Sequence, residues 1–270
     1  MVADSRSLSP SAAKPAKVVE SWQRQFLIDV HEPVPVTVDE LSQAHDRDFI
    51  EGVLSCQRSN GFGNKSPEVA ASLLYTSGAM LTGARHALQT KTVAVAPVSG
   101  FHHAEWATSM GFCTFNGLMV TALALKADGC KRVGILDLDM HYGNGTDDII
   151  NRFKIDWIAH FSGGASFTEP RQVTQFFNLL PEIMKVMSNC DVVLYQAGAD
   201  PHVNDPYGGW LTTDELRRRD GVVFDALKAA GTPVVWNLAG GYQTEPDGSI
   251  PKVLEIHDNT MRECVRVYGA

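Results

Sequence analysis

The stretch Ile135-Leu-Asp-Leu-Asp-Met-His141 decides the fold that this chain is expected to adopt, because it is an apolar run ending in three side chains able to bind a metal. Side chains of a β-strand alternate between two faces, so Asp137, Asp139 and His141 should project to the same side where the strand leaves a sheet. Two carboxylates so close together repel each other in a partly buried site, unless a cation or a hydrogen-bonded histidine offsets their charge. The simpler alternative is an acidic pair that faces water beside a histidine whose hydrogen bonds are satisfied.

The composition indicates an ordinary globular protein. The chain has 270 residues, 44% of them hydrophobic, which is enough for a substantial core in one large domain or two small ones. Its 23 Lys and Arg against 31 Asp and Glu give a formal charge of −8, which argues against a general nucleic-acid surface and mildly favours cationic small molecules. No stretch approaches the roughly 18 consecutive apolar residues of a membrane span. We therefore expect neither a nucleic-acid nor a membrane partner.

The cysteines indicate a reducing compartment. They are odd in number, widely spaced and without a C-x-x-C pair, so neither a disulfide framework nor a cysteine zinc cluster is expected. The N-terminus also lacks the sections of a secretory signal. We therefore expect a cytoplasmic protein. The cysteines are Cys56, Cys113, Cys130, Cys190 and Cys264.

Strand-like and helix-like segments alternate along the chain. Short β-branched or aromatic runs predict strands over residues 92–98, 132–138, 157–161, 192–196 and 233–238. Helical spacing predicts helices over 68–89, 116–128, 172–188 and 213–230, with Ser66-Pro67 at the start of the first and Thr213 as the N-cap of the last. This alternation predicts one α/β domain, a predominantly parallel sheet flanked by helices on both faces. Residues 1–20, rich in Ser, Ala, Lys and Pro, should form an N-terminal loop segment before a single domain over 21–270.

Polar side chains follow four of the five predicted strands. His102 and His103 come after the first strand, the Asp-Leu-Asp-Met-His cluster after the second, Asp200 after the fourth, and Tyr242 in a glycine-lined turn after the last. In open parallel sheets ligands bind beyond the carboxyl ends of the strands, because the loops converge there. A water-facing acidic pair requires no such coincidence, whereas a metal hydrolase needs ligands, acid/base groups and an oxyanion donor on different loops.

The residues at these strand ends could hold a catalytic metal. Such a zinc ion typically keeps three protein ligands and an open position for water, and Asp139, His141 and Asp200 supply that number. Asp137 would then be a supporting group behind them. An aspartate after Gly-Ala is often only a helix cap, so this assignment depends on the joint placement of the residues.

The remaining residues could move protons. His102 and His103 could orient and deprotonate a water molecule and then protonate a leaving amine, while Tyr242 could donate its phenol proton to a developing oxyanion. Each also has a simpler explanation, since adjacent histidines usually only pack and a tyrosine after two glycines is usually a turn residue. His160 could face the site as well, but a core histidine is the favoured interpretation.

These ordered motifs resemble the histone deacetylase family of the arginase/deacetylase superfamily. The similarity covers most of the chain and is closest in kind to bacterial-type deacetylases or acetylpolyamine amidohydrolases, although this chain is unusually short. The motifs that carry it are Gly100-Phe101-His102-His103-Ala104, Gly111-Phe112-Cys113, residues 136–145, 196–200 and 205–209, and Gly240-Gly241-Tyr242.

The resemblance implies a role for each site residue. The three ligands above would hold one zinc ion, with iron or cobalt as substitutes, within a catalytic domain over 21–270. His103 would be the general base and acid, His102 would be held by Asp137 as electrostatic support, and Tyr242 would polarise the acyl carbonyl.

The resemblance also implies a substrate channel. The acyl chain would lie between Gly111-Phe112 and an aromatic residue from the loop after His160, for which Phe167 is the candidate. The substrate would be an acylated amine, such as an acetyl-lysine peptide, an acetylpolyamine or a small amide. An oligomer partner could complete the mouth of the channel.

Three departures from the family pattern are expected to matter. Asn144 stands where some members have an aspartate, and a neutral partner should make protonated His103 less favourable. Lys65 occupies the place of a rim aspartate that grips peptide substrates, and it offers donors but no carboxylate. Only 60 residues separate the two ligand aspartates, and the loop 162–168 is short, so one channel wall should be reduced or rebuilt.

Two other functions fit the resemblance less well. A two-manganese ureohydrolase of the same superfamily needs another aspartate two residues after Asp200, where this chain has His202. A non-catalytic, deacetylase-like binding protein has no need of paired proton carriers. The sequence therefore favours a zinc-dependent hydrolase that removes an acyl group from an amine.

Overall fold

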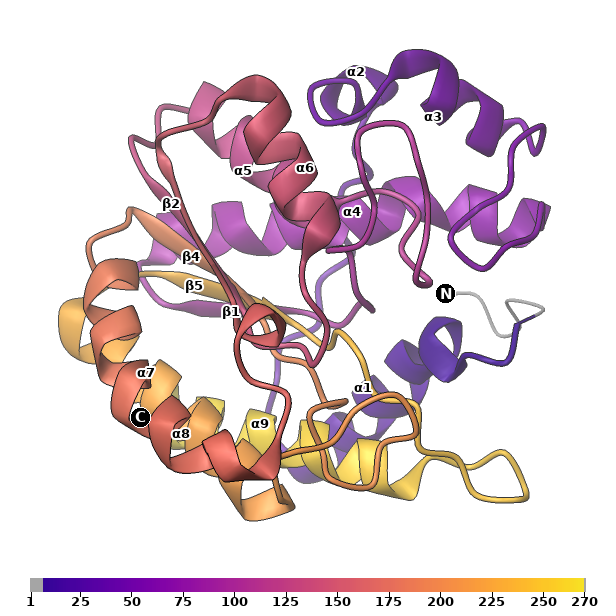
Figure 1. The fold of residues 1–270 in the computed structure, drawn as a ribbon. Coiled ribbons are helices and arrows are strands. Elements are labelled where there is room, and N and C mark those ends of the chain that lie inside the picture. Colours follow the sequence, from indigo (N-terminus) through magenta and orange to yellow (C-terminus); the bar gives the residue numbers. More distant parts are fainter. Residues whose placement is uncertain (1–6, 270) are drawn as a thin grey trace.

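The structure is a computed structural model that describes residues 7–269. At its centre lies a sheet of five parallel strands in the order β1-β5-β4-β2-β3 (Figure 1). The expected parallel sheet is confirmed, and β4 has the predicted bounds, whereas the other strands begin or end one or two residues from the predicted positions. The strands are β1 (Val93–Ala96), β2 (Val133–Asp137), β3 (Ile158–Ser162), β4 (Val192–Gln196) and β5 (Val234–Asn237).

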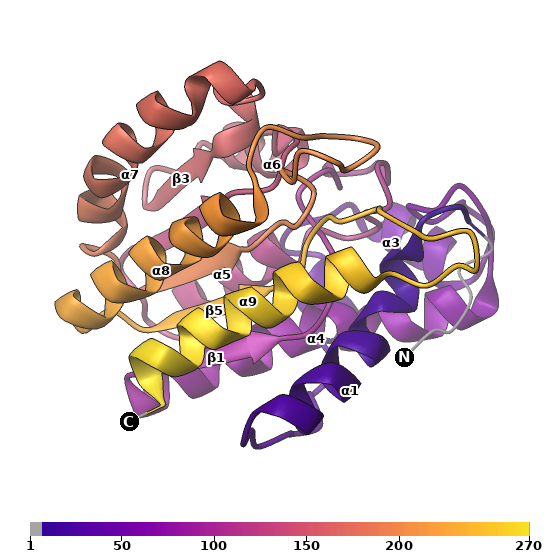
Figure 2. The same ribbon diagram turned by 90° about the horizontal axis from the view of Figure 1, so that it is seen from below.

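Helices form two layers, one on each side of the sheet (Figure 1). Figure 2 shows α1, α8 and α9 together in the layer seen from below. That layer contains α1 (Lys14–Gln25), α7 (Val173–Met187), α8 (Thr213–Ala230) and α9 (Pro251–Tyr268). The other contains α2 (Val38–Leu41), α3 (Arg47–Leu54), α4 (Pro67–Thr90), α5 (Gly117–Ala127) and α6 (Asn144–Phe153). Short 3-10 turns lie at Pro10–Ala12, Gly163–Ala165 and Pro170–Gln172.

The strands are mostly apolar because their side chains enter two cores, and the polar residues stand mainly at their carboxyl ends. In β4, Val193 and Tyr195 pack with the layer of α1, α7, α8 and α9, whereas Val192 and Leu194 pack with the layer of α2 to α6. A strand buried on both faces reads as a continuous apolar run instead of an alternating one. The expectation of helices on both faces is therefore confirmed.

Helix starts follow from local capping chemistry. Ser66 caps α4 and accepts a hydrogen bond from the Val69 amide at 3.3 Å, as predicted for the Ser66-Pro67 start. The N-cap of α8 is Thr212, so the assignment to Thr213 is wrong by one residue. Thr212 accepts from the Glu215 amide at 3.3 Å and donates its own amide to the Glu215 carboxylate at 2.8 Å, and this reciprocal pair requires a spacing of three.

The N-terminal segment is helical where a loop was expected. After the 3-10 turn at Pro10–Ala12, α1 runs across the boundary predicted at residue 20. Pro15 lies in the first turn of α1, where a missing amide hydrogen is tolerated, and Val18 and Trp22 are buried. The loop prediction is therefore wrong over the described part of 1–20, while residues 1–6 lie outside the described residues.

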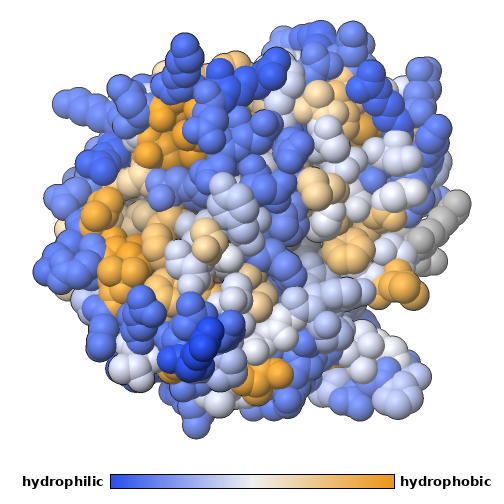
Figure 3. All heavy atoms as spheres, in the orientation of Figure 1, coloured by the Kyte–Doolittle hydropathy of each residue, from blue (hydrophilic) through white to orange (hydrophobic). Residues whose placement is uncertain are grey.

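The face of the molecule shown in Figure 3 has a mixed surface. Its hydrophobic side chains form separate patches with hydrophilic residues between them. The exposed large hydrophobic residues of the chain include Met110, Tyr142 and Tyr207, which all belong to loops. Among residues 7–269, no helix combines the length and apolar character that crossing a membrane requires.

Candidate metal centre and active site

The predicted site residues meet at the carboxyl edge of the sheet. Asp139 and His141 follow β2, Asp200 follows β4, and Gly240 follows β5, and these three strands are neighbours in the order β5-β4-β2. Parallel pairing brings their carboxyl ends to one edge, so residues about 100 positions apart in sequence become adjacent. The Gly240 amide donates to Asp139 Oδ2 at 3.0 Å, which joins the loops after β5 and β2.

Three donor groups form a compact cluster. The Nδ1 atom of His141 lies 3.3 Å from Asp139 Oδ1 and 3.1 Å from Asp200 Oδ2, and one donor atom from each residue fits within 4.8 Å of the others. Both carboxylates are buried, while the imidazole is partly exposed. Two carboxylates and an imidazole suit zinc, iron or cobalt, so the residues present fit a single divalent ion.

The electrostatics of this cluster favour positive charge. Hydrogen bonds that His141 donates to Asp139 and Asp200 raise the pKa of His141 to about 11. Burial and the nearby charge of Asp139 raise the pKa of Asp200 to about 7. Both shifts have the direction expected for two buried carboxylates close together, whose negative charge favours a cation between them.

Asp137 lies behind the cluster and binds His102. Its Oδ2 is 2.7 Å from His102 Nδ1, while its Oδ1 accepts from Gln196 Nε2 at 3.0 Å and from the Asp139 amide at 3.2 Å. Burial alone would lower the pKa of His102, but the charges of Asp137 and Asp139 outweigh it and raise this pKa to about 9. The imidazole of His102 is therefore a protonated group held between two carboxylates.

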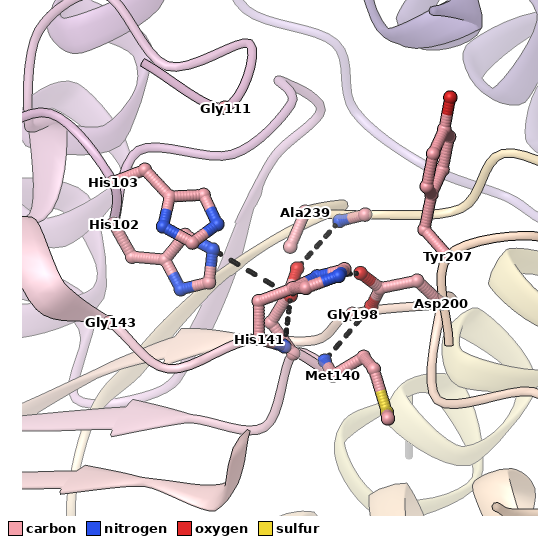
Figure 4. A network of polar contacts seen from close by, with 12 residues as sticks. His102, His103, Gly111, Met140, His141, Gly143, Gly198, Asp200, Tyr207 and Ala239 are labelled. Carbon is pink, nitrogen blue, oxygen red and sulfur yellow. Dashed lines mark hydrogen bonds and ion pairs between the residues drawn. The ribbon is translucent and has the colours of Figure 1, made fainter. Parts of the chain in front are cut away.

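His103 has the opposite electrostatic character. Its ring lies 4.1 Å from the ring of His102, and Figure 4 shows the two imidazoles on one side of His141 and Asp200. Burial and the neighbouring positive charge of His102 lower the pKa of His103. The loop that contains Gly111 packs directly against His103, because a Cβ atom at Gly111 would overlap the His103 ring.

Asn144 determines the tautomer of His103. Asn144 Oδ1 lies 2.6 Å from His103 Nδ1, and Asn144 Nδ2 donates to Glu105 Oε1 at 2.9 Å. Because a carboxylate accepts from the amide nitrogen, the amide oxygen must face His103. Nδ1 therefore carries the hydrogen, and Nε2 keeps a lone pair free to accept a proton.

Tyr242 lies at the edge of the cluster, in the turn that follows β5. Its amide donates to Asp205 Oδ2 at 2.8 Å, and its ring contacts Phe112 and Tyr207, with centroids 5.5 and 5.1 Å away. Burial and the charge of Asp200 raise the pKa of the Tyr242 phenol, which therefore stays protonated. The turn needs glycine, since a Cβ at Gly240 would overlap the Asp200 carboxylate.

The predicted channel wall at Phe167 is absent. Phe167 is 2% exposed and packs against Phe176 and Trp210 in the core, with centroids 5.4 and 5.9 Å away. In the loop after β3, Gly163 lies against Leu138 and Gly164 against the backbone of His141, so the residues of this loop nearest the cluster carry no side chain. Phe112, the other aromatic residue predicted for the channel, has a left-handed φ of 63° and contacts the ring of Tyr242.

Three other positions considered from the sequence are not part of the cluster. His160 Nδ1 binds Asp147 Oδ1 at 2.7 Å, in agreement with the favoured interpretation of a largely buried histidine outside the site. His202, two residues after Asp200, is buried and binds Thr213 and Gln243, at 3.0 and 3.2 Å. Lys65 is exposed in the loop before α4.

Sequence patterns had not singled out several buried residues that support the cluster. Lys14 donates to the carbonyl oxygens of Ala239 and Gly240, and burial lowers its pKa to about 8. Arg219 donates to carbonyl oxygens in the loops after β2 and β4. One signal was available for Arg219, because it occupies the apolar stripe of α8, three residues after Leu216 and four before Val223.

Comparisons with known proteins identify the family. A family model described as the histone deacetylase domain matches residues 10–162. An uncharacterised protein of Picosynechococcus sp. is 29% identical over 242 residues, covering 81% of this chain and 76% of that protein. A chloroplastic histone deacetylase 10 of Oryza sativa subsp. japonica is 30% identical over 268 residues, and the match spans only 60% of that protein's length.

Solved structures support the same fold. The HD domain of HDA15 has a TM-score of 0.79 at 20% identity, covering 95% of this chain and 85% of that one. An acetylpolyamine aminohydrolase from Burkholderia pseudomallei has a TM-score of 0.72 at 15% identity, covering 95% and 91%. Likeness at this identity shows the fold, while the match to the family model covers more than half of the chain. The family is one of deacetylases, which confirms the prediction of a hydrolase at that level, and the chain belongs to the histone deacetylase family.

Proposed function

We propose that the chain is a metal-dependent hydrolase that removes an acyl group, in the simplest case acetyl, from an amine. The observation that carries this proposal is the meeting of a three-donor cluster, two adjacent histidines and the turn that carries Tyr242 at one edge of the sheet. A metal hydrolase needs these groups together, whereas a binding protein needs no paired proton carriers. We also infer that residues 21–270 act as one catalytic domain in the cytoplasm, as the sequence suggests.

Asp139, His141 and Asp200 are the proposed ligands of one zinc ion, for which iron or cobalt could substitute. A bound ion of this kind makes a water molecule more acidic and polarises the acyl carbonyl. Asp137 is not proposed as a ligand, because its oxygens already bind His102, Gln196 and the Asp139 amide. Its role is to orient His102.

His103 is the proposed general base and acid. Its Nε2 lone pair can take a proton from the attacking water, since Nδ1 donates to Asn144, and its lowered pKa keeps this lone pair available at neutral pH. Taking the proton gives His103 a positive charge beside protonated His102. This repulsion favours delivery of the proton to the leaving amine, which completes the transfer.

Tyr242 is the proposed oxyanion donor. Its phenol keeps its proton, because burial and nearby carboxylates make the phenolate unfavourable. A donor held in a desolvated site stabilises charge that develops on the acyl oxygen, and removing one such donor typically raises the barrier by about 2 to 4 kcal/mol. The Asp205 contact with the Tyr242 amide holds the turn that carries it.

The shape of the mouth bears on the substrate. Phe112, Tyr242 and Tyr207 form a continuous aromatic wall, while the opposite side, after β3, ends in glycines and the exposed Ala165 and Ser166. An acyl amide would therefore pack on one aromatic wall and leave its other side open. This arrangement suits an acetylpolyamine or small amide as well as an acetyl-lysine peptide.

A substrate panel tests the proposal. The purified chain would be loaded with zinc or with iron and assayed against acetyl-lysine peptides, acetylpolyamines and small aromatic acyl amides, with the metal-free chain as control. We expect turnover of at least one class that depends on the metal. If the loaded chain hydrolyses no acyl amide, the proposed function is wrong and a binding role becomes preferable.

Metal counting separates this proposal from a ureohydrolase. The donor groups of one ion lie together in the cluster, and His202 is engaged with Thr213 and Gln243. We therefore expect elemental analysis to find about one ion per chain. Two manganese ions per chain would favour the ureohydrolase.

A further inference from the structure

Arg219 is a buried charge with no role in the proposed chemistry. It lies on the inward face of α8 and is 1% exposed. A charged side chain is costly to bury unless it is paired and hydrogen-bonded, so its partners indicate why it is there. An apolar residue would satisfy the packing of this helix stripe more simply.

The guanidinium joins the two loops that carry the proposed ligands. Arg219 Nη1 donates to the carbonyl oxygen of Leu138 at 3.1 Å and to that of Gly198 at 2.8 Å. Leu138 immediately precedes Asp139, and Gly198 lies two residues before Asp200. Arg219 Nη1 therefore connects the loop after β2 to the loop after β4. Each contact lies where the loop turns to present its carboxylate.

Arg219 is itself held from behind. Its Nε donates to Asp220 Oδ1 at 2.8 Å, and Asp220 also accepts from the Tyr195 hydroxyl and, at 2.6 Å, from Thr260 of α9. Arg219 and Asp220 together carry no net charge. The guanidinium faces the loops of the cluster, and the carboxylate faces α9. The planar fork of arginine suits this double task, which a lysine ammonium cannot reproduce in full.

We propose that Arg219 is a positioning residue for the proposed metal site, because one guanidinium sets the spacing of Asp139 and Asp200 before any ion binds. This inference rests on the proposed function, since it assigns those two residues as ligands. The expected effect is on metal affinity, as for other groups that orient ligands without touching the ion, where loss of one weakens affinity about 10- to 100-fold.

The test measures zinc affinity of the metal-free full chain by competition with a chromophoric chelator, together with Tm. Arg219→Met should bind zinc about 10- to 100-fold more weakly than the wild-type chain. Arg219→Lys should lie between them, because it keeps the charge but not the fork. Val223→Ala, one turn further along the same buried stripe, is the matched control and should lower Tm while leaving zinc affinity unchanged.

A double variant separates positioning from stability. Arg219→Met with Asp220→Asn removes both charges. The new amide can accept from the Tyr195 hydroxyl through its oxygen and donate through its nitrogen to the Thr260 hydroxyl, which can itself donate to the Ile256 carbonyl, so this variant should fold even if Arg219→Met alone does not. We expect a Tm close to wild type and zinc affinity still reduced. Wild-type affinity in this variant, or an equal loss in Val223→Ala, would overturn the positioning role. A wild-type chain that binds no zinc, or binds it no better than Asp139→Ala, would overturn the proposed function itself.

Discussion

The floor and the rim of the candidate site are built differently. The floor consists of Asp137, Asp139, Asp200 and His102, which are at most 4% exposed, lie at or after the carboxyl ends of strands, and are each hydrogen-bonded to another element. The rim, which includes Phe112 and Tyr207, lies on loops and is partly or largely exposed, and Lys65 is the exposed loop residue that the family resemblance predicts there. Sheet register determines the floor, whereas loop length determines the rim. The floor should therefore tolerate almost no change, and the rim should tolerate much.

The largest effect is expected from breaking the floor. Asp139→Ala removes a proposed ligand and leaves only His141 and Asp200, which still contact each other, so the chain should lose its stoichiometric metal and its hydrolytic activity. Elemental analysis and turnover measure the two losses. Asp156→Ala, the same change at an exposed aspartate, is the control and should retain both. Stoichiometric zinc in Asp139→Ala would contradict the ligand assignment.

A change at Tyr242, where the floor and the rim of the site meet, should have a smaller effect than the loss of Asp139. Tyr242→Phe removes one phenol proton and should raise the barrier to turnover by about 2 to 4 kcal/mol while leaving metal content unchanged. The control is Tyr207→Phe, whose ring packs on Tyr242 from the rim and which should stay close to the wild-type rate. Turnover of Tyr242→Phe at the wild-type rate would exclude the oxyanion role.

The charge beside His103 can be altered without touching a proposed ligand. A carboxylate stabilises an imidazolium, so Asn144→Asp should raise the lowered pKa of His103, by about one unit or more. The base must be unprotonated, and activity is lost as pH falls through this pKa. The acidic limb of the pH profile of kcat/KM should therefore move to higher pH.

Glu105 complicates that change, because it already faces position 144. The double variant Asn144→Asp with Glu105→Gln removes the repulsion between two carboxylates and should show the shift with the fold undisturbed. An acidic limb that stays in place in both variants would mean that another group acts as the base.

The smallest effect is expected at the outer rim. Lys65 is exposed, and surface substitutions typically change stability by no more than about 0.5 kcal/mol. Lys65→Ala should change kcat/KM for a small acyl amide by less than about twofold, the equivalent of a similar free energy. Steady-state kinetics measure this. A tenfold loss would show that the rim contributes more to the site than its exposure suggests.

The sheet was predictable because its residues obey one simple requirement. The run 192–196 has no alternation of apolar and polar residues before its final glutamine, as expected of a strand buried on both faces, and β4 has those bounds. Errors arose where several local patterns were compatible with the sequence. Two adjacent threonines left the cap of α8 ambiguous until the pairing with Glu215 was known, and Lys14-Pro15 looked like a loop although it begins α1.

Within the site, residue types alone indicated the floor, and its geometry agrees with that pattern in the clustering of Asp139, His141 and Asp200. The roles of these residues stay predictions. Phe167 was misplaced because nothing in the local sequence distinguishes an aromatic residue that faces a channel from one that packs in the core. Arg219 was missed because its meaning lies in two carbonyl groups on distant loops.

The sequence by itself determined the alternation of strands and helices and the chemistry available at each strand end, since both depend on residue type and short-range spacing. Only the tertiary structure decided which of those groups meet. The division of the Ile135 to His141 run is the clearest case: Asp139 and His141 turn toward Asp200, while Asp137 turns back to His102 and Gln196. The physical reason is that pairing β2 with β4 brings Gln196 beside Asp137 and Asp200 beside Asp139, and no local pattern contains that register.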